Sequence, residues 1–240
     1  MSRVKNTVLF ALPVVAVLTS MAMAGPMIEI PESTFDFGRV SQHAVVSHRF
    51  WIKSTGDDTL RITRIESGCG CTEAPLRDSV LAPGDSTVLE ILFSTKSYRG
   101  PISKSPNLET NVDDAKVYLK IKADLLADPQ QARPIMLDPY RLDVSQYKAK
   151  PRLRARFQIH NRDTVDYRIT LIDHADEFFD VRLPEVVKAG DSAWGGVKVH
   201  KSVAEKEFEH SLTFEINDDD ATRFTLPVKR LYRVQDRGSR

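Results

Sequence analysis

Short stretches in which apolar and polar residues alternate recur along most of this chain of 240 residues. The clearest stretch places four residues on one side of an extended segment: Val46, His48, Phe50 and Ile52. A period of two residues is typical of a β-strand with one buried face. Residues 88–93 are apolar on both faces, and turn-forming sequences such as Pro83-Gly84-Asp85 separate the stretches. Because no sustained helical period follows residue 24, the pattern predicts an all-β protein.

Three segments of the chain return in the same order one domain length later. Residues 50–53 recur as 157–160 at an offset of 107, while 82–86 recur as 188–192 and 108–115 as 214–221, both at an offset of 106. A period this long is a whole domain rather than a solenoid repeat. About seven short strands in some 100 residues are typical of an immunoglobulin-like β-sandwich. The sequence therefore predicts two tandem sandwich domains, at residues 25–128 and 129–240, joined at a polar stretch that contains proline.

The first 24 residues have the three parts of a secretory signal. Arg3 and Lys5 precede an apolar stretch at 8–18, and Ala22-Met23-Ala24 supplies the small residues of a cleavage site before Gly25. Eleven apolar residues are too few to span a bilayer. Because the residue after the cut is glycine rather than cysteine, a lipid anchor is not expected. We predict a cleaved Sec-type signal peptide at 1–24 and a periplasmic or extracellular location.

The charge balance gives no sign of a strongly charged partner for the whole molecule. The chain has 34 basic and 33 acidic residues, and removal of the signal leaves 32 basic and 33 acidic ones, a net charge of −1. Nucleic-acid binding proteins usually carry a clear excess of positive charge. We therefore expect no nucleic-acid partner, and no membrane-spanning segment in the mature chain.

The order of several short motifs gives the first domain a family resemblance. The motifs are Phe35-Asp36-Phe37-Gly38-Arg39-Val40, residues 46–50, Ser54-Thr55-Gly56, Ser67-Gly68-Cys69-Gly70-Cys71-Thr72, residues 83–86 and Thr110-Asn111. Together they resemble the bacterial DUF1573 family, which is similar to the ASH/MSP/hydin branch of immunoglobulin-like domains. The resemblance covers Ile28 to Leu126, and Ser54 departs from it where the family usually has asparagine. It implies an exported sandwich protein of uncharacterised role and brings no catalytic residues.

Cys69 and Cys71 are the two cysteines of the chain. They allow a disulfide, a metal site or a pair of buried thiols. Cα atoms two residues apart in a strand are about 6.5 Å from each other, near the upper limit of roughly 6.8 Å for a bridge, so a disulfide calls for a tight turn at Gly70. At an offset of 107 the second copy has Asp176 and Phe178 instead. Since the duplicate contains no thiol, the fold does not require the pair. We predict a structural role for it, either as packed thiols or as an oxidised bridge, because cysteine is among the residues most often buried and an oxidising compartment tends to close an accessible pair.

A metal site is the alternative for these cysteines, and no cofactor is expected otherwise. Soft thiolates suit Cu(I) and Zn(II), and His48 is the nearest inward-facing histidine, so Cys69, Cys71 and His48 form the candidate ligand set. A single inward histidine is more often a hydrogen-bonded core residue than a ligand. We therefore expect no metal, and retain this set as the alternative.

Five basic residues recur at every second position before and within a predicted strand: Lys148, Lys150, Arg152, Arg154 and Arg156. On one continuous strand they would line a single face for about 27 Å. Such a stripe can bind an acidic protein, an anionic glycan or lipid headgroups. The alternative is a solvated outer face, or an edge strand whose charges prevent aggregation.

The sequence contains no recognisable catalytic motif. It lacks a nucleophile elbow, a metalloprotease helix motif and a phosphate-binding glycine loop. We therefore expect no enzyme activity, and predict a structural or protein-interaction module whose partner is another envelope protein. Residues 35–40 and the Cys-Gly-Cys segment form the predicted contact region. The competing hypothesis is a copper-binding or redox protein that acts through Cys69 and Cys71.

Overall fold

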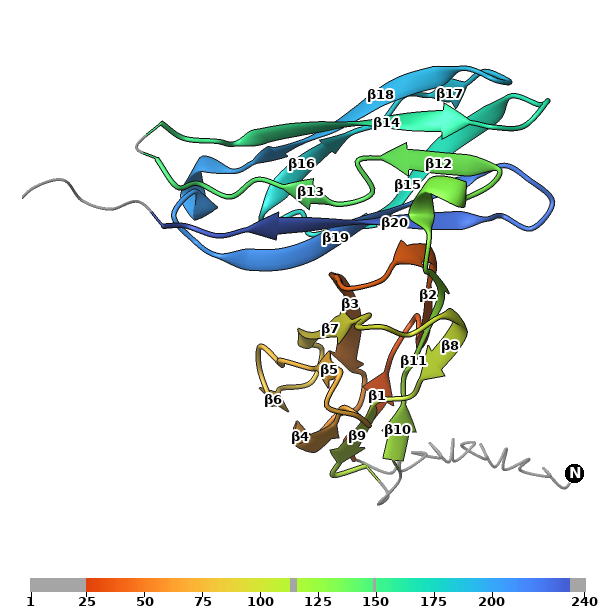
Figure 1. Ribbon diagram of the computed structural model, residues 1–240. Coiled ribbons are helices and arrows are strands. Elements are labelled where there is room, and N and C mark those ends of the chain that lie inside the picture. The colour runs from red at the N-terminus through yellow and green to blue at the C-terminus, as the bar shows by residue number, and fades with distance from the viewer. Residues whose placement is uncertain (1–24, 113–115, 149, 234–240) are drawn as a thin grey trace, which may run out of the picture.

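The computed structural model describes residues 25–112, 116–148 and 150–233. This part of the chain consists of β-strands and two short 3-10 helices, and it contains two separate hydrophobic cores (Figure 1). One core is built from residues between Phe35 and Leu125, and the other from residues between Ile135 and Val228. The all-β prediction is therefore confirmed. The predicted signal peptide at 1–24 lies outside the described residues.

The first half forms a sandwich from two four-stranded sheets and a third group of strands. One sheet has the order β1 (Ile28–Glu29), β3 (Val45–Ser54), β7 (Ser86–Ser94), β5 (Thr72–Glu73). The second has the order β10 (Lys116–Tyr118), β9 (Asn107–Thr110), β4 (Leu60–Glu66), β6 (Val80–Leu81). The third group is β2 (Thr34–Ser41), β11 (Lys120–Leu126) and β8 (Gly100–Lys104), in which β2 and β11 are parallel.

The second half repeats this order of strand pairing. Its first sheet is β12 (Ile135–Asp138), β14 (Arg154–Asn161), β18 (Ser192–Val199), β16 (Phe179–Arg182). Its second sheet is β17 (Val186–Val187), β15 (Tyr167–His174), β19 (Phe208–Ile216), β20 (Arg223–Arg230), with β13 (Leu142–Asp143) parallel to β20. The helix η1 (Pro129–Gln131) lies at the joint between the halves, and η2 (Lys201–Val203) follows β18.

Strand β3 shows how the alternating sequence produces the first core. Val46, His48, Phe50 and Ile52 are buried, as the period of two predicts, while Trp51 on the opposite face is exposed. The inward side chains pack with residues of β2, β4 and β7 in one hydrophobic cluster. Burial of such side chains contributes about 1.5–3 kcal/mol each, which makes this alternation the main determinant of the strand.

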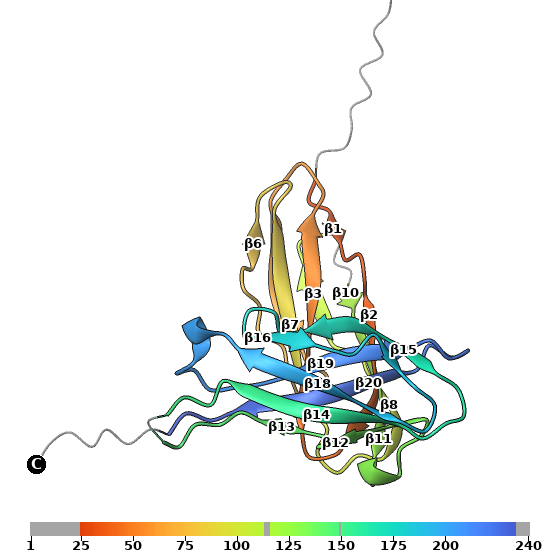
Figure 2. The same cartoon turned by 90° about the horizontal axis from the view of Figure 1, so that it is seen from above.

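The two halves are joined by a sheet that continues from one into the other. Its order is β17-β15-β19-β20-β2-β11-β8, and the step between the halves is a parallel bridge at Arg39 and Phe224. Figure 1 shows the long strands β19 and β20 lying across the ends of β2 and β3, and Figure 2 shows the same crossing from above. Within the described residues there is no helix of the length and apolar character needed to cross a membrane.

Candidate functional site

Cys69 and Cys71 are joined by a disulfide, and their Cα atoms are 5.3 Å apart. Residues 69–71 form a turn rather than an extended strand, which is why the Cα distance is shorter than the value of about 6.5 Å expected for a strand. Gly68 has a φ of +77°, a conformation that favours glycine. Cys71 is buried in the first core, and Lys96 Nζ donates a hydrogen bond to the carbonyl oxygen of Gly70 at 3.2 Å. Of the two predicted alternatives, packed thiols and an oxidised bridge, the structure contains the bridge.

We expect removal of this disulfide to have a small effect on stability. In Cys69→Ser/Cys71→Val the ring that opens is three residues long, so the loss should be about 1.5 kcal/mol or less, and valine keeps the buried position apolar. Urea unfolding of both proteins measures the difference. Alkylation in denaturant should label no thiol in the oxidised wild type and two after reduction; two labels without reduction would contradict the bridge.

His48 is a core residue in contact with the second half of the chain. Its ring stacks on Phe35, with centroids 3.6 Å apart, and meets the edge of Phe50. Its Nδ1 atom lies 2.7 Å from Oδ2 of Asp173 on β15. Strands β3 and β5 pair with opposite edges of β7, so the structure does not bring His48 to the disulfide. In the ranges that the structure describes, no cluster of three or more His, Cys, Asp or Glu side chains is arranged to hold a metal ion.

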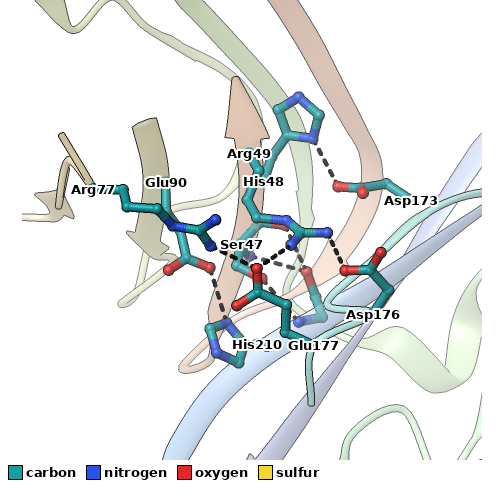
Figure 3. A network of polar contacts seen from close by, with 10 residues as sticks. Ser47, His48, Arg49, Arg77, Glu90, Asp173, Asp176, Glu177 and His210 are labelled. Atoms are coloured by element: carbon teal, nitrogen blue, oxygen red, sulfur yellow. Dashed lines mark hydrogen bonds and ion pairs between the residues drawn. The ribbon is translucent and has the colours of Figure 1, made fainter. Parts of the chain in front are cut away.

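The loop between β15 and β16 carries acidic residues that bind arginines of the first half (Figure 3). Arg49 Nη2 lies 2.5 Å from Asp176 Oδ1, and Arg77 Nη2 lies 2.6 Å from Glu177 Oε1. Burial alone would raise the pKa of Asp176, but the hydrogen bond and the positive charge of Arg49 lower it below its ordinary value. This loop occupies the position that the Cys-Gly-Cys segment has in the first half. The duplicate segment therefore forms an interdomain contact in place of a disulfide.

Two buried serines form a reciprocal hydrogen-bonded pair between β3 and β19. The backbone N–H of Ser47 donates to Oγ of Ser211 at 2.9 Å, and the N–H of Ser211 donates to Oγ of Ser47 at 3.2 Å. Nearby, Thr225 Oγ1 donates to the carbonyl oxygen of Phe37 at 2.6 Å. Because buried polar groups are costly unless they are paired, these bonds favour one relative position of the two halves.

His210 lies beside these serines in an apolar environment. Its ring packs against Phe178 and Phe208, and its Nδ1 atom is 3.3 Å from Oε1 of Glu90 without a hydrogen bond in the described structure. Burial, with a smaller effect of Arg49, lowers the pKa of His210 to about 4. Burial also raises the pKa of Glu90. Both side chains are therefore shifted towards their neutral forms.

The low pKa of His210 gives a testable pH dependence. Between pH 6.5 and about 4 the unfolded chain binds a proton that the folded chain does not, so the stability due to His210 is lost as the pH falls. From pH 7.5 to pH 5 this loss should be about 2 kcal/mol. Protonation of Glu90 acts in the opposite sense, so the measurement is the difference between wild type and His210→Phe in urea unfolding at both values. Equal pH dependence of the two proteins would contradict the assignment.

The predicted basic stripe is only partly a strand. Arg154 and Arg156 are on β14, whereas Lys148, Lys150 and Arg152 precede it in an irregular segment, so the prediction of one continuous strand was wrong. The reason is local: Pro151 has no N–H for a ladder, and the carbonyl oxygen of Arg152 accepts a hydrogen bond from Arg230 instead. All five basic side chains are nevertheless exposed.

Sequence reasoning missed a residue that lies beside these arginines. Trp194 on β18 is 52% exposed, and the guanidinium of Arg156 lies 4.8 Å from the centroid of its ring. Lys198 is on the same outer face, because Arg154 pairs with Lys198 and Arg156 pairs with Gly196. The signal available in the sequence was Trp194-Gly195-Gly196, an aromatic residue at a polar position of the alternating pattern.

The predicted contact region at residues 35–40 is occupied by the chain itself. Phe35, Phe37 and Val40 are buried in the first core, and Arg39 pairs with Phe224 of the second half. The hypothesis that this segment faces an external partner was therefore wrong. Phe35 and Phe37 both lie in the first core, and Thr225 of the second half donates a hydrogen bond to the carbonyl oxygen of Phe37.

Comparison with known proteins finds a family match in the first half. Residues 28–125 match the model of the family DUF1573, described as a protein of unknown function, which agrees with the resemblance that the motifs indicated. No curated protein matches the sequence. The chain is similar to a protein of unknown function from Porphyromonas gingivalis W83, with 12% identity, a TM-score of 0.33, and coverage of 84% of this chain and 99% of that one. It is also similar to the ASH/PapD-like domain 7 of human CEP192, with 8% identity, a TM-score of 0.36, and coverage of 49% and 99%.

Proposed function

We propose that this chain is an exported, non-enzymatic module of the cell envelope whose two docked sandwich domains present a fixed surface to another protein. The observation that carries the proposal is the hydrogen-bonded sheet and polar network that join the two halves. Domains in one chain move relative to each other unless their interface is extensive. Here a shared sheet, the buried pair Ser47 and Ser211, and the ion pair of Arg49 with Asp176 all oppose that motion.

The candidate site residues His48, Cys69 and Cys71 have structural partners within the chain, which supports a binding role over a catalytic one. His48 is held by Asp173, and Cys69 is bonded to Cys71. The disulfide and the histidine lie apart, so the copper or redox alternative has only the cysteine pair to support it. Exposed aromatic side chains are typical of protein-binding surfaces, and among the described residues three besides Trp194 are more than half exposed: Trp51, Tyr118 and Tyr147.

Site-specific photo-cross-linking in the producing cell tests this function. A photoreactive amino acid is placed in turn at Trp51, Tyr118 and Tyr147, with Lys122 as an exposed polar control position. We expect a discrete protein adduct from at least one aromatic position in the exported fraction, with Gly25 as the first residue of the chain. The adduct should persist in Cys69→Ser/Cys71→Val. No adduct at the three positions would refute the binding function, and loss of the adduct in the cysteine variant would favour the thiol alternative.

A further inference from the structure

The outer face of the sheet β12-β14-β18-β16 carries unneutralised positive charge. Arg154, Arg156 and Arg182 have no carboxylate oxygen within 4 Å among the described residues, whereas Lys198 lies 3.9 Å from Asp180. A hollow of about 410 Å³ lies where β14 begins and β18 ends, and it is lined by Leu153, Arg154, Lys198, Val199, His200 and Lys201. A recess lined by both basic and apolar residues is suited to an acidic group attached to an apolar body.

The basic residues continue from this hollow to Trp194 in a row. Arg154 lies opposite Lys198, and the next outward pair along β14 and β18 is Arg156 and Gly196. Arg182 on β16 also lies opposite Gly196, so two guanidinium groups border a position without a side chain. Trp194 lies four residues from Lys198, which is about 13 Å along the strand. The row therefore has positive charge in its middle and at the end that borders the hollow, and an exposed aromatic ring at its other end.

The position of the row argues against recognition through the backbone of β18. This strand is hydrogen-bonded to β14 on one side and to β16 on the other, while β14 also pairs with β12 at residues 158–161. A peptide added to a sheet gains its affinity from free edge groups, which β18 does not provide. Acidic residues also border the row, with Asp138 on β12 and Asp180 on β16. A flat anionic membrane would meet both carboxylates at once, whereas a narrow linear polymer that follows β14 and β18 would approach Asp180 only where Lys198 lies 3.9 Å from it.

We propose that this face binds a linear acidic polysaccharide. Its carboxylate or sulfate groups contact Arg154, Arg156, Arg182 and Lys198, and the apolar face of one sugar ring stacks on the exposed ring of Trp194. Arg156 holds that ring in place from one side. This binding goes beyond the protein-binding function proposed above and involves none of the three aromatic positions used to test it.

Binding of the mature chain to polygalacturonate, dextran sulfate and uncharged dextran tests the proposal. Calorimetry or affinity electrophoresis should show salt-dependent binding of the two acidic polymers and none of dextran. Arg154→Glu/Arg156→Glu should weaken binding at least about tenfold, because two attractive contacts become repulsive. Trp194→Ala should weaken it about fivefold through loss of ring stacking. Arg61→Glu/Arg168→Glu changes the net charge equally on exposed positions of β4 and β15, and should change binding less than about twofold.

Several outcomes would overturn the assignment. The site is refuted if both acidic polymers bind no better than dextran. It is also refuted if the Arg61/Arg168 control loses as much affinity as the Arg154/Arg156 variant. Tighter binding of poly-glutamate, oligothymidylate or anionic lipid vesicles than of polygalacturonate would assign the face to another class of ligand. Unchanged binding by Trp194→Ala would reduce the site to a general anion-binding surface. Thermal unfolding of each variant checks that the fold is intact.

Discussion

Gly38→Ala is expected to separate the two halves of the molecule or to lower its free energy of unfolding by about 3 kcal/mol. This figure combines a backbone strain of about 1 kcal/mol with the cost of forced overpacking. Gly38 is on β2 and has a φ of +62°. A Cβ atom at this position would lie 2.2 Å from the carbonyl oxygen of Arg223 on β20. That oxygen belongs to the backbone of the other half, so no side-chain rotation can relieve the contact. The strands at the joint would have to move apart.

Gly100→Ala is the matched control for this substitution. Gly100 has a similar φ of +67°, but a Cβ atom there would meet no atom within 4 Å. The control therefore contains the backbone strain without the interdomain contact, and should cost about 1 kcal/mol. Urea unfolding gives the two free energies, and small-angle scattering reports whether Gly38→Ala becomes more extended. Equal effects of the two variants would show that the joint at β2 and β20 does not hold the halves together.

The sequence allowed prediction of those parts of the fold that depend on apolar alternation. The inner face of β3 is formed by Val46, His48, Phe50 and Ile52. Phe157 and Ile159 lie on the inner face of β14. These strands could be found because burial of alternate side chains is a local and repeated signal. Residues 88–93 gave a second kind of signal, because they are apolar on both faces of β7 and not only on the inner one. On the outer face Val88 is 5% exposed and lies beside the second half.

The interdomain network could not be predicted from the same pattern. Ser47 and Ser211 occupy outward positions of their strands, where a serine that faces water looks no different in sequence from a serine that faces another domain. Only the docked structure distinguishes the two cases. The disulfide was left open for a related reason, because its formation depends on the turn at residues 69–71 and not on the spacing of the cysteines. The loop with Asp176 was visible only as the thiol-free counterpart of Cys69.

Arg230 should be the most sensitive side chain of the second half. It is fully buried, and within the described structure no carboxylate lies within 4 Å of it. Its guanidinium donates instead to backbone carbonyl oxygens, to Val144 at 2.5 Å, to Arg152 at 2.9 Å and to Ala204 at 2.9 Å from Nε. It also donates to Oε1 of Gln146 at 3.0 Å. Burial lowers the pKa of Arg230 below its ordinary value, but arginine remains charged at any pH at which the protein is folded.

We expect Arg230→Met to destabilise the protein by about 3–5 kcal/mol, because three buried or partly buried carbonyl groups and the buried side-chain oxygen of Gln146 lose their donor. Arg230→Lys should recover only part of the loss, since an ammonium group cannot reproduce the planar set of donors. Lys229→Met is the matched control: it removes a positive charge from the neighbouring, exposed position of β20, and should cost less than about 1 kcal/mol. Urea unfolding measures all three variants.

The position of Arg230 also links the stability of the second half to the basic outer face of the sheet β12-β14-β18-β16. Its hydrogen bonds to Arg152 and Ala204 tie the segment before β14 to the turn that contains η2, and these two segments form the walls of the hollow beside Arg154 and Lys201. In Arg230→Met, amide hydrogen exchange should therefore increase first at residues 150–153 and 201–205, while β3 and β7 keep their protection. Uniform loss of protection through both halves would show that Arg230 supports the whole molecule rather than this end of the second sandwich.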